Sequence, residues 1–127
     1  MTLPKKILVV DDEPSILFSL THLFKIDGVE VIACNEIEQA EAALATTPFD
    51  LVIADIRMSG VDGIEGLELL SYVKQHYAIP VIIMTGFGSR EIEEEAQQRG
   101  VHYFLRKPVE IKELLSSVAT LGIPVRQ

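Results

Sequence analysis

The 127-residue sequence has no tryptophan, a single cysteine and no long apolar segment. A lone cysteine, Cys34, cannot form a disulfide within the chain, which is typical of proteins kept in a reducing compartment. No apolar run approaches the roughly 18 residues that a membrane-spanning helix needs. Only four apolar residues follow the first lysines, too few for the core of a secretory signal. These absences predict a soluble cytoplasmic protein.

Basic residues are also scarce, since 11 Lys and Arg face 19 Asp and Glu and give a net charge of −8. Such an acidic chain is a poor partner for nucleic acid or for an anionic membrane, which attract basic surfaces. The 48% of hydrophobic residues is ordinary for a globular protein. We therefore expect one domain over residues 1–127, with a core of about 5–121. Residues 122–127 would be a frayed tail or the start of a linker.

Short apolar runs alternate with segments of helical period along the chain. Residues 111–118 show the clearest helical spacing, with apolar side chains at i, i+3, i+4 and i+7. Pro14 suits the first turn of the first helix, Asn35 is a candidate cap for the second, and Gly100 is well placed to end the fourth. Five consecutive strand–helix units predict a doubly wound α/β fold with a parallel sheet. The expected strands are 7–10, 29–33, 51–54, 81–84 and 103–105.

Chemically useful side chains follow four of these strands, and in a parallel sheet they meet at the carboxyl edge. Clustered carboxylates repel one another, and a hard divalent cation such as Mg²⁺ relieves that repulsion. A carboxylate beside the metal can attack phosphorus, while a lysine and a hydroxyl bind the phosphoryl oxygens. The pattern therefore predicts an aspartyl phosphate. The residues concerned are Asp11, Asp12 and Glu13 after the first strand, Asp55 after the third, Thr85 at the end of the fourth, and Lys107 after the fifth.

Four pieces of sequence resemble the receiver domain of two-component response regulators. They are ILVVDDEPSI, LVIADIRMSGVDGIEGLELL, PVIIMTGFGS and GVHYFLRKP, and the resemblance covers residues 5–121. It implies a flavodoxin-like fold of five parallel strands in the order 2-1-3-4-5. It also implies a switch that is phosphorylated with Mg²⁺ by a histidine kinase or histidine phosphotransfer protein. Such a domain is not an enzyme beyond catalysing its own phosphorylation and dephosphorylation.

The resemblance assigns a role to individual residues of this chain. Asp55 would be the phosphoacceptor, Asp12 a direct Mg²⁺ ligand and Asp11 a ligand through water. The backbone carbonyl of Arg57 would be a further metal ligand. Two residues, Thr85 and Lys107, would bind the phosphoryl group, and Phe104 would be the aromatic residue that switches with Thr85.

The same resemblance predicts how the signal leaves the domain. Phosphorylation would change the surface of the fourth helix, fifth strand and fifth helix, to which an output domain or a downstream protein binds. It allows a phosphorylation-dependent homodimer, and implies no direct contact with nucleic acid or membrane. The chain departs from the family pattern at Ser59, where proline is usual, and in residues 63–70, which are about two residues longer. The start of the third helix, with Gly66 as a weak point, is therefore left open.

Three other functions fit the sequence less well. A haloacid-dehalogenase-like phosphatase needs a DxDx(T/V) motif after the first strand, which residues 11–15 do not provide. A flavodoxin-like electron carrier needs a Ser/Thr/Gly-rich first loop to bind phosphate, which this sequence lacks, and no Trp is available to stack on a flavin. A phosphorylation-independent interaction module remains as the alternative. Cys34 and the three histidines, His22, His76 and His102, are expected to be packing or surface residues.

Overall fold

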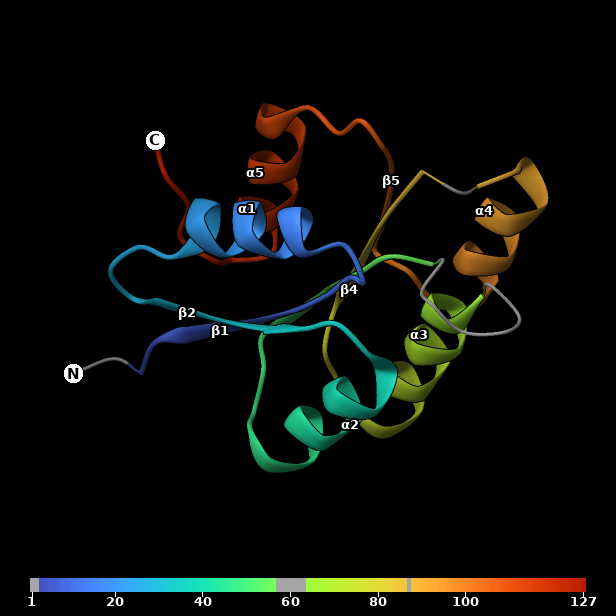
Figure 1. Ribbon diagram of the computed structural model, residues 1–127, viewed down its shortest axis with the longest axis horizontal. Helices are drawn as coiled ribbons and strands as arrows, with labels where there is room; N and C mark the ends of the chain where they lie inside the picture. Colours follow the sequence, from blue (N-terminus) through green and yellow to red (C-terminus); the bar gives the residue numbers. More distant parts are fainter. Residues whose placement is uncertain (1–2, 57–63, 87) are drawn as a thin grey trace.

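A parallel five-stranded sheet lies between two layers of helices in the computed structural model, which describes residues 3–56, 64–86 and 88–127 (Figure 1). The strand order is 2-1-3-4-5, and every neighbouring pair is parallel. The predicted fold class and strand order are therefore confirmed. The strands are β1 (Lys5–Val10), β2 (Val29–Cys34), β3 (Leu51–Ala54), β4 (Val81–Thr85) and β5 (Tyr103–Arg106).

The helices lie on both faces of the sheet, as right-handed strand–helix–strand connections require when the strand order reverses. Figure 1 shows α1 and α5 on one face and α2, α3 and α4 on the other. Among the described residues, no helix is long and apolar enough to cross a membrane. The helices are α1 (Pro14–Phe24), α2 (Ile37–Thr46), α3 (Glu65–His76), α4 (Arg90–Gln98) and α5 (Ile111–Thr120).

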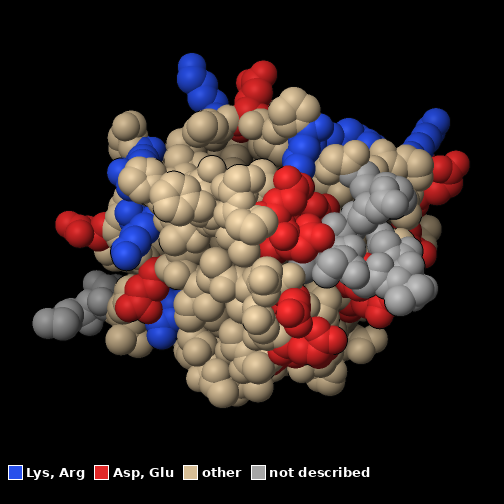
Figure 2. Space-filling view, in the orientation of Figure 1, with Lys and Arg blue, Asp and Glu red and all other residues tan. Residues whose placement is uncertain are grey.

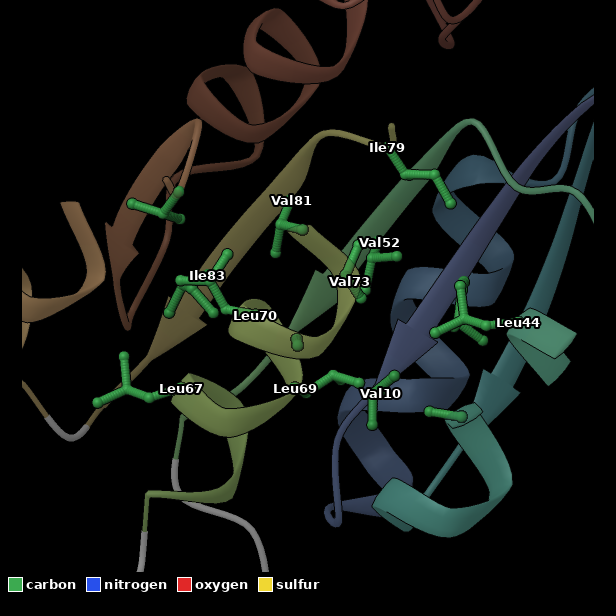
Figure 3. Packing of buried hydrophobic residues seen from close by; sticks show 14 of the residues in the cluster. Val10, Leu44, Val52, Leu67, Leu69, Leu70, Val73, Ile79, Val81 and Ile83 are labelled. Atoms are coloured by element: carbon green, nitrogen blue, oxygen red, sulfur yellow. The ribbon is translucent and has the colours of Figure 1, made fainter. Parts of the chain in front are cut away.

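Successive residues of the inner strands point to opposite faces, and both faces are covered. In β1, Ile7 and Val9 pack toward α1 and α5, whereas Leu8 and Val10 pack toward the other layer, and all four are buried. This double burial explains why the inner strands are continuously apolar rather than alternating. Figure 3 shows the second layer, in which Leu67, Leu70 and Val73 of α3 lie against the strand residues Val52, Val81 and Ile83.

Two of the three predicted helix signals operate as expected. Pro14 is the first residue of α1, and Gly100 follows α4 with a φ of +95°, a conformation that glycine adopts readily. The prediction that Asn35 caps α2 is wrong. The residue before α2 is Glu36, which makes no side-chain capping hydrogen bond. The backbone N–H of Asn35 instead donates to Gln39 Oε1 at 3.1 Å. Asn35 lies one residue before the capping position, so its side chain does not cap the first turn of the helix.

Ile123 and Arg126 contact the domain within the last six residues. Ile123 is buried between α1 and α5, and Arg126 reaches the carboxyl end of α1. Its guanidinium donates to three backbone carbonyls that the helix leaves without partners, those of His22, Leu23 and Lys25, at 2.9 to 3.2 Å. A cation at this end of a helix is favoured by the helix dipole. Residues 122–127 therefore form a strap beside α1, and the expectation that they are a tail or the start of a linker stays a prediction.

Candidate functional site

The carboxyl edge of the sheet brings together residues that are far apart in the sequence. The amide of Asp11 donates to the carbonyl of Cys34 at 3.1 Å, and that of Asp55 to Val10 at 3.1 Å. The amide of Lys107 donates to the carbonyl of Thr85 at 2.8 Å. Each residue thus continues the hydrogen bonding of the sheet one position beyond its own strand. The sheet itself therefore fixes the backbone positions of the site.

Lys107 is the centre of this group. Its Nζ lies 3.0 Å from Asp11 Oδ2, 3.0 Å from Asp55 Oδ2 and 3.6 Å from Glu13 Oε1. The Lys107 side chain is 16% exposed, and those of Asp11 and Asp55 are 4% and 7% exposed. Charged hydrogen bonds in such a water-poor position are stronger than surface ion pairs. The lysine therefore holds the two buried carboxylates in place.

Three carboxylates converge at the same point. One oxygen each from Asp11, Glu13 and Asp55 lies within 4.8 Å of the others, which makes the group able to hold a metal ion. The amide of Glu13 donates to Asp11 Oδ1 at 3.0 Å, so the turn after β1 folds Glu13 back toward Asp11. Figure 2 shows acidic side chains gathered on this face of the molecule.

The sequence analysis grouped Glu13 with the acids of this loop but assigned it no role. Glu13 follows Asp11 by two residues at a turn, and this spacing is the sequence signal that could have identified Glu13 as a member of the carboxylate cluster. Asp12 is half-buried and is not one of the three clustered carboxylates, so its assignment as the direct ligand stays a prediction. Arg57, predicted as a carbonyl ligand, lies outside the described residues, as does Ser59.

The pKa values of Asp11 and Lys107 are both raised, which favours the neutral form of Asp11 and the charged form of Lys107. Burial raises the pKa of Asp11 above its ordinary 3.8, although the amide of Glu13 and the ammonium of Lys107 both lower it. Burial alone would lower the pKa of Lys107, but Asp11 and Asp55 outweigh it and raise that pKa above 10.5. Lys107 is therefore a fixed positive charge at neutral pH. Ionisation of the Asp11 carboxyl costs more free energy in the folded protein than in the unfolded chain.

The structure also settles the start of α3. This helix begins at Glu65, and the amide of Gly66 donates to the carbonyl of Ile56 at 2.9 Å. Gly66 is buried against the chain that leaves β3, immediately after Asp55. Gly66, expected to be a weak point of α3, is also the residue through which the start of the helix packs on the segment that carries Asp55.

Thr85 and Phe104 occupy neighbouring strands at this edge. Thr85 is the last residue of β4 and is 1% exposed, so it is buried at the carboxyl edge. Phe104 lies in β5, is half-buried and packs against the core layer formed with α2, α3 and α4. Both lie where the sequence analysis placed them. Cys34 is buried, and His22, His76 and His102 are exposed, in line with packing and surface roles.

Comparison with known proteins identifies the family. The model of the response regulator receiver domain matches residues 7–119 of this chain. The chain belongs to the receiver domain family. It is a response regulator receiver of a two-component system, and this family does not consist of catalytic enzymes.

The receiver domain is similar to curated proteins of quite different length. It is 35% identical over 115 residues to the response regulator protein FleR of Pseudomonas aeruginosa, covering 90% of this chain and 24% of FleR. It is 32% identical over 115 residues to the sporulation initiation phosphotransferase F of Bacillus subtilis, covering 90% of both chains. The chain thus spans about a quarter of the longer relatives, which include PilR and DctD of Pseudomonas aeruginosa.

Solved structures agree with this assignment. A CheY-like receiver domain from Methanospirillum hungatei is 29% identical with a TM-score of 0.83, and the match covers 94% of each chain. A receiver protein from Pseudomonas putida is 27% identical with a TM-score of 0.85, covering 94% of this chain and 99% of that one. The receiver fold therefore extends over nearly the whole length of the chain.

Proposed function

We propose that this receiver accepts a phosphoryl group on Asp55 from a phosphohistidine of a histidine kinase or a histidine phosphotransfer protein. The observation that carries the proposal is the position of Lys107, whose Nζ lies 3.0 Å from both Asp55 Oδ2 and Asp11 Oδ2. Receiver domains generally partner a histidine kinase.

The transfer needs little from the protein except position and charge. A carboxylate oxygen of Asp55 forms a bond to phosphorus while the phosphorus–nitrogen bond of the phosphohistidine breaks. The bonding electron pair leaves with the imidazole nitrogen. Lys107 then exchanges a carboxylate contact for a phosphoryl oxygen, and the Thr85 hydroxyl donates to another. Both residues lie at the carboxyl edge, because Thr85 ends β4 and Lys107 directly follows the adjacent strand β5.

The donor set suits Mg²⁺, which prefers oxygen ligands and uses only one or two carboxylates with water and phosphate. Asp11, Glu13 and Asp55 supply carboxylate oxygens within 4.8 Å of one another. Asp12 and the Arg57 carbonyl remain ligands by resemblance to the family. When bound, the ion neutralises charge on the phosphoryl oxygens. The positive charges of Mg²⁺ and Lys107 would then together balance the negative charge of the carboxylates.

Phosphorylation is proposed to act through Thr85 and Phe104. A phosphoryl group on Asp55 attracts the Thr85 hydroxyl, and the chain after β4 moves with it. Phe104 has no phenolic hydroxyl, so packing alone favours its inward position. The resulting change reaches the surface formed by α4, β5 and α5, where an output domain, a downstream protein or a second copy of the chain would bind. A cytoplasmic location, without direct nucleic-acid or membrane contact, fits this function.

A labelling experiment tests the proposal. The protein is incubated with Mg²⁺ and acetyl phosphate, and addition of one phosphoryl group that hydroxylamine removes is followed by intact-mass measurement. Asp55→Asn is expected to abolish labelling, because the amide is nearly isosteric but not nucleophilic. Asp27→Asn, which changes an exposed carboxyl at the opposite edge of the sheet, is the matched control and is expected to label normally. Labelling of Asp55→Asn at the wild-type level would contradict the assignment of Asp55. No labelling of the wild type would favour the phosphorylation-independent module.

A further inference from the structure

The end of β5 is tied to the start of α4 by one side chain. Arg106 is the last residue of β5, pairs in register with Thr85 and directly precedes Lys107. Its guanidinium donates to Glu93 Oε1 of α4 at 2.6 Å and to the backbone carbonyl of Gly88. One arginine thus joins a strand of the carboxyl edge to both the first half of α4 and the residue two positions before that helix begins.

The same guanidinium rests on the aromatic ring of the proposed switch. The Cζ atom of Arg106 lies 5.3 Å from the centre of the Phe104 ring, a cation–π distance. Gly88 lies close to both the Phe104 ring and the Arg106 guanidinium. A Cβ atom on Gly88 would lie 3.1 Å from Phe104 Cζ and 3.1 Å from a terminal nitrogen of Arg106. Ring, guanidinium and Gly88 backbone therefore lie so close together that a side chain at residue 88 would require the ring or the guanidinium to shift by a few tenths of an ångström.

These contacts are specific to the present arrangement of the three groups. If the Phe104 ring rotates away, the guanidinium loses the face on which it rests. If the chain three residues after Thr85 moves, the carbonyl of Gly88 leaves its donor. Either movement of the proposed switch therefore breaks an Arg106 contact or requires the arginine side chain to move with its partners.

We propose that Arg106 is a latch that holds Gly88, Phe104 and α4 in the arrangement in which Lys107 contacts the Asp55 carboxylate directly, and so sets how strongly phosphorylation must act to switch the surface. The latch rests on the proposed phosphorylation of Asp55. Arg106 is a positioning residue, because it touches neither the carboxylate cluster nor the phosphoryl group. Its side chain is 49% exposed and that of Glu93 is 40% exposed. Its effect is therefore a bias between two conformations rather than a large gain in stability.

The chain offers a matched control on the same helix. Arg90 Nε pairs with Glu94 Oε1 at 3.3 Å within α4, and both side chains are more exposed than those of the latch. The control pair makes no contact between α4 and β5. Arg106→Met and Arg90→Met each remove one arginine from one ion pair and keep an unbranched apolar side chain. Only the first removes the connection to Gly88 and Phe104.

Two measurements test the latch. In the unphosphorylated protein, Arg106→Met is expected to speed amide hydrogen exchange at the start of α4 severalfold. Its apparent affinity for the phosphoryl mimic beryllofluoride, with Mg²⁺, is expected to rise about fivefold, because a larger fraction already has the switched conformation. Glu93→Gln is expected to show a smaller change in the same direction, and Arg90→Met none. Arg106→Lys, which keeps the charge but not the two-pronged contact, is expected to fall between wild type and Arg106→Met.

The results separate this proposal from the one on which it rests. If wild type binds beryllofluoride and Arg106→Met binds it no more tightly than Arg90→Met, the latch is wrong while phosphorylation at Asp55 stands. A mere loss of melting temperature in Arg106→Met with unchanged beryllofluoride affinity would show a structural role only and overturn the latch. If wild type does not respond to beryllofluoride at all, both proposals fail together.

Discussion

A Cβ atom on Gly66 would lie 2.0 Å from the carbonyl oxygen of Asp55 and 2.4 Å from the Cα atom of Ile56. Both are backbone atoms of the segment that carries the proposed phosphoacceptor, and real Cβ atoms are not found so close to them. The first turn of α3 therefore packs directly on the chain leaving β3. The position of Asp55 depends on the absence of a side chain at residue 66.

Gly66→Ala is expected to destabilise the protein by about 2 kcal/mol, since a clash of about 3 kcal/mol is offset by the higher helix propensity of alanine. Thermal unfolding followed by circular dichroism measures this. Gly86→Ala is the control, because the one contact that a Cβ there would make with the described residues is ordinary, 3.9 Å from Lys107 Cβ. Equal melting temperatures for Gly66→Ala and Gly86→Ala would show that α3 does not press on Asp55.

Lys107→Met is expected to destabilise the metal-free protein by about 3 kcal/mol, because it leaves buried carboxylates without compensation. Mg²⁺ is expected to restore more stability to this variant than to wild type. Denaturant unfolding with and without Mg²⁺ provides the comparison. Lys6→Met, which removes a surface contact of 3.9 Å to Glu30, should cost less than about 1 kcal/mol.

The pH dependence of the Lys107 contribution has a definite sign. The folded-state pKa of Lys107 lies above the unfolded value of 10.5, so the stabilisation is fully present below pH 10.5. It is lost as the pH rises through the raised pKa. A difference in stability between wild type and Lys107→Met that instead disappeared between pH 6 and 9 would contradict the ion pair as its source.

Asp11→Asn is expected to stabilise the metal-free protein at pH 7. Burial raises the folded-state pKa of Asp11 above 3.8. Protonated Asp11 therefore contributes to the stability of the fold below pH 3.8, and this contribution is lost as the pH rises through the raised pKa. The variant's advantage is therefore expected to vanish below pH 3.8. Melting temperatures over a pH series, with Asp27→Asn as control, test this. A lower melting temperature for Asp11→Asn at pH 7 would mean that the stabilisation from the Asp11–Lys107 ion pair exceeds the free-energy cost of burying the Asp11 carboxylate.

Magnesium binding is expected to be weak and to fall with falling pH as protons compete for the carboxylate oxygens. Asp12→Ala is expected to reduce the affinity more than Asp11→Ala, if Asp12 is the direct ligand. Glu13→Gln, which removes the most exposed of the three clustered carboxylates, measures whether that group takes part. Isothermal titration calorimetry distinguishes the three. A larger loss for Asp11→Ala than for Asp12→Ala would reverse the ligand assignment.

Thr85→Ala is expected to leave Asp55 phosphorylation measurable but to uncouple it from the α4–β5–α5 surface. The methyl group cannot donate a hydrogen bond to the phosphoryl group, so the chain after β4 is no longer drawn toward it. Heteronuclear NMR with and without beryllofluoride compares the response of this surface. A response equal to that of wild type would rule out the Thr85 hydroxyl as the link.

The sequence by itself determined the parallel α/β fold and the positions of Asp11, Asp55, Thr85 and Lys107. Continuous apolar runs identify strands buried on both faces, and whatever follows such strands must meet at one edge. These are local patterns of spacing, and a single chain displays them directly. The error at Asn35 arose at a helix boundary, where a shift of one residue decides whether a side chain can act as a cap.

Only the tertiary structure decided which side chains and backbone atoms touch across elements. The packing of Gly66 on Asp55 and the convergence of Glu13 on Lys107 depend on how neighbouring loops lie. The bridge from Arg106 to Glu93 and the strap from Arg126 to the end of α1 join residues 13 and about 100 positions apart. The period of hydrophobic residues and the residue types do not predict which of these side chains form pairs. They form because burial of the two core layers brings those elements within reach, and hydrogen-bond geometry then selects the partners.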